Sequence, residues 1–178
     1  MNPITESTTI PMLLRDVVSH VHDENTTFLL HKINDSWAEI SYKDVLHTAD
    51  AVSSYFLEMG IQKGDRLGLI IENSVEWVFY DQGIQQIGGV NVSIYPTLSE
   101  QEIEYILNDS GVKTMLVGNP FLFKKILKIA NNCPELQRII PVFEDYQRHI
   151  PATDLNAGVI NFANLISEGL KCIPLFQK

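Results

Sequence analysis

Short apolar segments alternate with longer amphipathic segments along most of this 178-residue chain. Four of the apolar segments are nearly unbroken, which is typical of strands covered on both faces of a parallel sheet. These predicted strands are Leu67–Ile71, Val90–Ile94, Thr114–Val117 and Arg138–Phe143. Between and before them, apolar residues recur at helical spacing, which predicts helices over Tyr42–Met59, Ser74–Ile87, Glu100–Ser110 and Phe121–Ala130.

Capping residues mark the ends of these elements. Ser41–Asp44 and Ser99–Glu102 have the spacing of capping boxes, in which a serine and an acidic residue three positions later bond to each other's backbone N–H groups. Asn119 can cap the helix that begins with Pro120, because proline is tolerated in the first turn. Gly60 follows the clearest amphipathic segment and suits the left-handed end of a helix.

The two ends of the chain add further predicted elements. Thr9–Val21 has one apolar stripe and predicts a short surface helix. Thr27–Lys32 and Trp37–Ile40 flank an Asn-Asp turn and predict a β-hairpin. The segment 144–157 is polar and has backbone breakers, so we expect a surface loop there. Asn161–Gly169 predicts a last short helix.

Strands that alternate with helices of about ten or more residues imply right-handed crossovers and a parallel sheet covered on both faces. The predicted fold is therefore a doubly wound, mostly parallel α/β sheet preceded by a helix and a hairpin. We expect one subdomain over residues 1–178: the helix and hairpin in 9–41, the βα-repeat core in 42–143, and a loop and terminal helix in 144–178.

Composition narrows the class of protein. The chain is 45% apolar and 20% charged, which is ordinary for a globular domain. Thirteen basic and 22 acidic residues give a net charge of −9, which argues against nucleic acid as a partner. Cys133 and Cys172 lie far apart, without metal-like spacing, and resemble reduced thiols. Met1–Leu14 has neither a basic start nor an apolar core of a leader, so the expected compartment is the cytoplasm.

Ligands of doubly wound sheets gather beyond the carboxyl ends of the strands. These ends are Glu72–Asn73, Tyr95–Thr97, Gly118–Asn119 and Glu144–Asp145. An acidic magnesium site would need paired aspartates after the first strand, and Glu72–Asn73 stands there instead. Helix capping and strand termination are the favoured interpretation of these residues.

Recognised phosphate-binding motifs are absent from the sequence. Neither a Gly-x-Gly-x-x-Gly run after a strand nor a Gly-Lys-Ser/Thr ending occurs, and Gly64, Gly68, Gly88 and Gly89 each have a turn or packing explanation. The five histidines have no nucleophile or orienting carboxylate at a useful spacing, so a catalytic or metal-binding role is disfavoured for all of them. They are His20, His22, His31, His47 and His149.

Two further groups of side chains have competing interpretations. Lys124, Lys125 and Lys128 form a basic helix face, which is more often solvated surface than a membrane-binding surface. Trp77, Phe79 and Tyr80 could line a hydrophobic ligand tunnel, although aromatic residues on a buried helix are more often part of the core.

Three segments together resemble the N-terminal part of adenylate-forming acyl-CoA synthetases, in particular the long-chain fatty-acid–CoA ligases. They are Trp37–Tyr42, Gly60–Trp77 and Gly88–Val117. The specific signal is the combination of Lys63–Arg66, of Asn73–Ser74 with Glu76–Trp77, and of Ile94–Thr97. The resemblance covers roughly Ile10–Gly169, and Val159–Gly169 is similar to the segment shortly before the phosphate-binding loop of that family.

The resemblance implies a fragment. The family's phosphate loop, its adenine-binding and ribose-binding motifs and its C-terminal catalytic lysine have no counterpart in Met1–Lys178. We therefore expect the first subdomain of a longer ligase, inactive alone, with no catalytic, cofactor-binding or metal-ligating residue of its own. The parent enzyme would use ATP, Mg and coenzyme A to convert a fatty acid to its acyl-CoA through an acyl-adenylate.

The resemblance also bears on partners. The expected partners are the remainder of the same ligase chain and, for the parent, fatty acid, ATP and coenzyme A, while peripheral membrane contact and a homodimer stay open. Two alternatives remain for function. One is an adenylate-forming ligase for an aromatic or amino-acid substrate, and the other is a self-contained, non-catalytic doubly wound interaction module.

Overall fold

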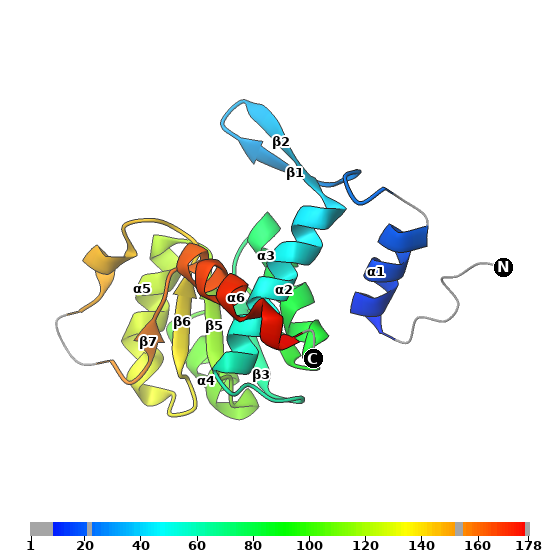
Figure 1. The fold of residues 1–178 in the computed structure, drawn as a ribbon. Coiled ribbons are helices and arrows are strands. Elements are labelled where there is room, and N and C mark those ends of the chain that lie inside the picture. Colours follow the sequence, from blue (N-terminus) through cyan, green and yellow to red (C-terminus); the bar gives the residue numbers. More distant parts are fainter. Residues whose placement is uncertain (1–8, 21–22, 152–154, 177–178) are drawn as a thin grey trace.

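Five parallel strands form the central sheet in a computed structural model of the chain, which describes residues 9–20, 23–151 and 155–176 (Figure 1). The strands are β3 (Arg66–Ile70), β4 (Val90–Ser93), β5 (Thr114–Val117), β6 (Arg138–Pro141) and β7 (Gly158–Val159). They lie in the order β4-β3-β5-β6-β7, and every neighbouring pair is parallel. The order reverses direction at β3, which confirms the predicted doubly wound sheet.

Helices cover both faces of this sheet. α2 (Tyr42–Glu58), α3 (Val75–Gln86) and α6 (Phe162–Phe176) share one apolar cluster with Leu67 and Leu69 of β3. α4 (Glu100–Ser110) and α5 (Pro120–Ile129) share the other cluster with Ile70 and Met115. Successive strand residues point to opposite faces, so the unbroken apolar runs supply both clusters. Among the described residues, η2 (Ala130–Asn132) and η3 (Tyr146–His149) are short 3₁₀ helices.

The predicted caps are present. Ser41 and Asp44 form a capping box at the start of α2, and Ser99 and Glu102 form another at the start of α4. Asn119 Oδ1 accepts the Leu122 N–H at 3.0 Å, with proline in the first turn of α5. These local bonds explain why the helix starts could be predicted from the sequence.

The N-terminal elements lie beside the sheet domain. α1 (Ile10–His20) is tied to α2 by an ion pair between Arg15 and Asp50. β1 (Thr27–Ile33) and β2 (Ser36–Ser41) form the predicted hairpin, and Asn34 takes the positive φ of 54° in its turn. Figure 1 shows this hairpin projecting from the N-terminal end of α2. Val21 and His22 lie outside the described residues.

Three predicted segments differ from the structure by more than one residue. β6 ends at Pro141 instead of Phe143, although the Val142 N–H still donates to the Val117 carbonyl at 3.1 Å. The loop 144–157 contains η3 and runs into the strand β7, where Gly158 pairs with Arg138. The terminal helix does not stop at Gly169 but continues to Phe176.

Close contact with α2 explains why Gly169 lies inside a helix. A Cβ built on Gly169 would lie 2.0 Å from the backbone oxygen of Ala51 in α2. On the other flank of α2, a Cβ on Gly83 of α3 would lie 2.5 Å from Val52 Cγ1. Glycine at these points lets the backbones of α6 and α3 approach α2 more closely than a side chain allows.

A buried hydroxyl group completes the contact between α2 and α3. Ser53 Oγ lies 2.8 Å from the Ala49 carbonyl oxygen, 3.1 Å from the Gly83 carbonyl oxygen and 2.5 Å from Gln86 Oε1. The hydroxyl therefore has polar partners in both helices, which removes the cost of burying it.

Polar bonds tie together the loops at the amino ends of the strands. Asp65, before β3, pairs with Lys113, before β5, at 2.7 Å, and its carboxylate also accepts the Gln62 N–H at 2.8 Å. Burial alone would raise the pKa of Asp65, but the Lys113 ammonium and the Gln62 N–H outweigh it and lower the pKa below its ordinary value. Arg66 adds a bond from its Nε to the Ser110 carbonyl.

We predict that Gly169→Ala lowers the free energy of unfolding by about 2–4 kcal/mol, because the new methyl group collides with the α2 backbone. In an open helix interior the same change stabilises by about 0.5–1 kcal/mol, so the sign is diagnostic. Urea denaturation followed by circular dichroism measures the difference. Ser167→Ala, at an exposed position of α6, is the control and should change stability by less than about 0.5 kcal/mol.

We predict that Asp65→Asn weakens the acid dependence of stability. Because the folded-state pKa is lowered, the stabilising contribution of Asp65 is present above the pKa of an unfolded aspartate and is lost as pH falls through the folded-state value. The variant should lose about 1 kcal/mol at neutral pH and should converge with the parent in strong acid. Denaturation curves across acidic pH test this, and an undiminished pH slope in the variant would contradict it.

Candidate functional site

A cleft of about 560 Å³ lies at the carboxyl edge of the sheet, between the ends of β3 and β4. Its lining residues come from these two strands, the segments that follow them and the first turn of α3: Leu69, Ile71, Glu72, Asn73, Trp77, Ser93, Ile94, Tyr95 and Pro96. Its volume is within the range of small-molecule sites. The structure therefore brings together two of the four strand ends that the sequence singled out.

The cleft does not open at the point where the strand order reverses between β3 and β5. There the Gly118 N–H donates to the Ile70 carbonyl at 3.0 Å. A Cβ on Gly118 would lie 2.6 Å from Ile71 Cγ1 and 3.0 Å from Ile71 Cα. The two chains thus stay in contact one residue beyond the strands, and the free space lies on the β4 side of β3.

The walls of the cleft are mainly apolar. Leu69 and Ile94 are buried, and the half-buried Trp77 packs against the core cluster that contains Leu69. Tyr95 stands at the rim with 77% of its surface exposed. An exposed aromatic residue next to a partly buried one forms a surface that can contact an apolar group.

Ser93, which lines the cleft, stands at the end of a chain of hydrogen bonds. Asp81 Oδ1 accepts from Asn91 Nδ2 at 2.6 Å, and Asn91 Oδ1 accepts from the Ser93 hydroxyl at 3.3 Å. Gln85 Nε2 donates to the second oxygen of Asp81 at 2.6 Å. This chain orients Ser93 at the cleft, where its oxygen can accept a hydrogen bond.

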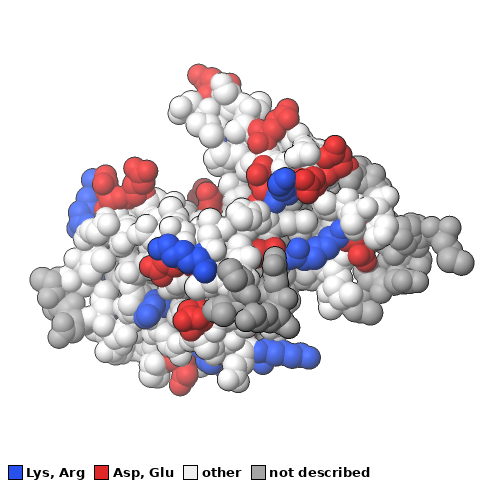
Figure 2. Space-filling view, viewed as in Figure 1, with Lys and Arg blue, Asp and Glu red and all other residues white. Residues whose placement is uncertain are grey.

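A second cleft of about 420 Å³ adjoins the first and separates the hairpin from the start of α3. It is lined by residues of both hairpin strands, including His31, Lys32 and Trp37, and by Asn73 and Ser74. Asn73 lines both clefts. Figure 2 shows the hairpin as a projection separated from the main body by a notch, with acidic side chains around it.

The other polar strand-end residues serve local structure. Ser74 caps α3 by accepting the Trp77 N–H at 3.4 Å, and Asn119 caps α5. Asp145 has φ 56° and pairs weakly with Arg148 at 3.9 Å. The capping interpretation is confirmed for Asn119, Ser74 caps α3 instead of the neighbouring Asn73, and Glu144–Asp145 does not line the cleft.

The aromatic residues of α3 divide between core and cleft. Tyr80 is fully buried, its hydroxyl lies 2.7 Å from Thr114 Oγ1, and burial raises its pKa far above the ordinary value. Phe79 packs against the same core cluster. Tyr80 is therefore core, as the favoured interpretation held, while Trp77 is the aromatic residue of α3 that lines the cleft.

The histidines are dispersed. His20 and His47 are exposed on α1 and α2, His31 lies on the hairpin, and His149 lies in η3. Within residues 9–20, 23–151 and 155–176, no three histidine, cysteine or acidic side chains are grouped so that they could hold a metal ion. Gly64 and Gly88 take positive φ in turns, and a Cβ on Gly68 or Gly89 would meet core side chains.

The three lysines of α5 have different surroundings. Lys125 Nζ donates to the Leu98 carbonyl at 2.7 Å and lies 4.9 Å from the Phe121 ring centre. Lys128 pairs with Glu100 at 2.7 Å, and Lys124 is exposed. In the part of the chain that the structure describes, no helix is long and apolar enough to span a bilayer.

The sequence profile of the AMP-binding enzyme family matches residues 18–158, which is most of the chain. The chain belongs to the AMP-binding enzyme family. The match includes the hairpin, both clefts and all the sheet strands except part of β7.

Curated relatives within this family are acyl-CoA ligases. The long-chain-fatty-acid–CoA ligase ACSBG1 of Rattus norvegicus is 31% identical over 116 residues, which make up 65% of this chain and 16% of the relative. ACSBG2 of Xenopus laevis, also a long-chain-fatty-acid–CoA ligase, is 27% identical over 143 residues, which make up 80% of this chain and 19% of the relative. The chain thus spans less than a fifth of the length of these relatives.

Solved adenylate-forming structures share the fold. The A-PCP didomain of carboxylic acid reductase from Segniliparus rugosus, in complex with AMP, aligns with a TM-score of 0.80 at 12% identity and covers 96% of this chain and 28% of its own. The anthranilate CoA ligase AuaEII, in complex with anthranoyl-AMP, aligns with a TM-score of 0.72 at 25% identity and covers 94% of this chain and 30% of its own.

Sequence reasoning missed Ser93 of β4, which lines the cleft, and Asn91, which accepts a hydrogen bond from it. Asn91 and Ser93 stand at alternating positions between Val90, Val92 and Ile94, so they share one side of the strand. Two polar residues in a strand predicted to be buried were the available signal, because a buried polar side chain needs a partner.

We predict that the cleft beside Trp77 accepts an aliphatic alcohol such as 1-hexanol. In the variant Trp37→Phe, Trp77 is the remaining tryptophan, and its emission should shift as the alcohol displaces water from the cleft. The matched variant Trp77→Phe reports Trp37, which is 62% exposed and lines the smaller cleft, so its emission should shift less. Equal responses of the two variants would contradict a site at the cleft.

Proposed function

We propose that the chain is the N-terminal part of a long-chain fatty-acid–CoA ligase, in which residues 1–178 form one structural subdomain. The observation that carries the proposal is the family match over residues 18–158, joined to 27–31% identity with ligases named for long-chain fatty acids. The combination of Lys63–Arg66, Asn73–Ser74 and Ile94–Thr97 supports the same assignment.

In this proposal the parent reaction has two steps. The fatty-acid carboxylate attacks the α-phosphate of Mg-ATP, which forms an acyl-adenylate and releases pyrophosphate. The thiol of coenzyme A then attacks the acyl carbon and displaces AMP. Such chemistry requires positioning and neutralisation of phosphate charge, and we place the groups that supply both outside residues 1–178.

The described residues would then act as a scaffold. The Asp65–Lys113 pair and the packing around α2 hold the sheet, and the sheet positions the carboxyl-edge cleft. A fold completed by further chain also gives the hairpin a packing partner for its exposed apolar residues, of which Leu30 and Trp37 are 58% and 62% exposed. Isolated two-stranded hairpins are marginal in water, so an additional packing partner favours this arrangement.

An aromatic carboxylic acid is the second candidate substrate. The observation that favours it is the 25% identity with the anthranilate CoA ligase AuaEII over 94% of the chain. A panel of carboxylates supplied to the full-length enzyme decides between the two, because the rate of acyl-CoA formation will select aliphatic or aromatic acids.

We predict that the 178-residue chain alone neither binds Mg-ATP nor forms a thioester. Calorimetry should show no binding heat with Mg-ATP, whereas the full-length chain should catalyse fatty-acid-dependent exchange of pyrophosphate into ATP. Folding of the short chain is checked by circular dichroism, so that a null result is not due to misfolding. Turnover of fatty acid to acyl-CoA by the 178-residue chain would overturn the proposed division of roles.

A further inference from the structure

A separate pocket of about 400 Å³ lies between α5 and three residues near it, His149, Pro151 and Leu155. Lys124, Leu127 and Lys128 line it from one stripe of α5, and Asn131 extends that stripe into η2. His149, Pro151 and Leu155 form the opposite wall. α5 and α6 cover opposite faces of the sheet, so this pocket is remote from the α2–α6 packing (Figure 1).

The walls of this pocket are joined by specific contacts. Asn131 Oδ1 accepts the Asn156 N–H at 3.0 Å, which fixes the segment beside Leu155 to the end of α5. The His149 ring stands edge-on to Phe143 with 6.2 Å between the ring centres, and Phe143 packs against Phe123 of α5. The pocket is therefore built by the same apolar cluster that holds α5 on the sheet.

The charges around the pocket are mainly positive, although the chain as a whole carries −9. Lys128 shares its charge with Glu100, and Arg148 lies 3.9 Å from Asp145. Lys124 has no carboxylate within ion-pair distance among the described residues. A cation at the mouth of a cavity with apolar walls favours an anion that also carries an apolar group.

His149 adds a titratable group to the same wall. Burial lowers its pKa, and the nearby charges of Lys124 on α5 and Arg148 on η3 lower it further, against a weaker opposite effect of Asp145. Arg148 Nε donates to His149 Nε2 at 3.4 Å, an arrangement that suits the neutral ring. A bound anion would offset these positive charges and make protonation of His149 easier.

We propose that this pocket is a binding site for a small organic anion with an apolar body. Lys124 holds the anionic head together with Lys128 and His149, and the apolar body lies against Leu127, Pro151 and Leu155. A carboxylate and a phosphate monoester share this chemistry. The site is distinct from the cleft between β3 and β4, and the proposal does not depend on ligase activity.

The test is an NMR titration of the His149 ring in the 178-residue chain with octanoate and, separately, with octyl phosphate. Either ligand should raise the pKa of His149 and leave the ring signals of His47, on the opposite face of the sheet, unchanged. The ligand with the larger effect identifies the head group. Octanol supplies the body without the charge, and acetate and inorganic phosphate supply the charge without the body, so all three should bind more weakly.

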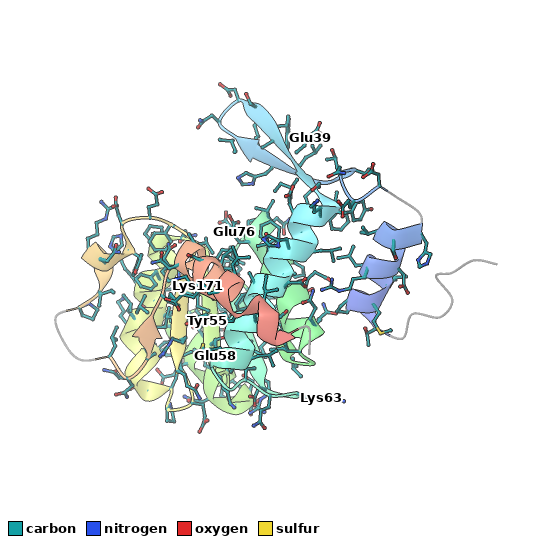
Figure 3. All side chains as sticks on the ribbon, viewed as in Figure 1. Glu39, Tyr55, Glu58, Lys63, Glu76 and Lys171 are labelled. Atoms are coloured by element: carbon teal, nitrogen blue, oxygen red, sulfur yellow. The ribbon has the colours of Figure 1, made fainter. Side chains whose placement is uncertain are left out.

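Lysine variants localise the site. Lys124→Gln should weaken binding about three- to fivefold, as expected for one partly solvated charge. The double variant with Lys128→Gln should weaken it about tenfold. Lys171→Gln is the control, because Lys171 is exposed on α6 on the other face (Figure 3), and its affinity should equal that of the parent. Equal binding of octanol and octanoate, or unaltered binding by the double variant, would overturn the proposal.

Discussion

The close approach of α3 and α6 to α2 is the constraint on which the rest of the structure depends. Ala51 receives the backbone of α6 at Gly169, and Val52 receives the backbone of α3 at Gly83. Because the three helices pack as one layer, the N-terminus of α3 lies at a defined position above the end of β3. That position places Asn73 between the two clefts and Trp77 in the wall of the larger one.

Features determined by neighbouring residues could be predicted from the sequence. The two capping boxes, the Asn119 cap and the four main strands depend on short-range bonds and on apolar runs, and the structure confirms them within a few residues. The terminal helix was predicted only as far as Gly169, whereas it continues to Phe176. The need for a glycine at position 169 comes from its contact with Ala51, which is far away in the sequence.

The same distinction applies to the sites. The rule for doubly wound sheets identified the edge of the sheet at which the larger cleft lies. It could not show that Gly118 contacts Ile71, so that the cleft opens on the β4 side of β3. The pocket beside Lys124 was also beyond sequence reasoning. It requires residues of α5 to face His149 and Leu155, and only the tertiary fold establishes that pairing.

The bonds that Asp65 and Arg66 make with the end of α4 and the segment after it determine where the fold can accept amino-acid substitutions. They cross-link the loops at the amino edge of the sheet, whereas the larger cleft at the carboxyl edge is bounded by Tyr95 and other partly exposed side chains. Substitutions that reshape that rim therefore leave the bonds at the opposite edge intact. Substitutions at the carboxyl edge can therefore change what the cleft binds, while the bonds at the amino edge keep the sheet intact.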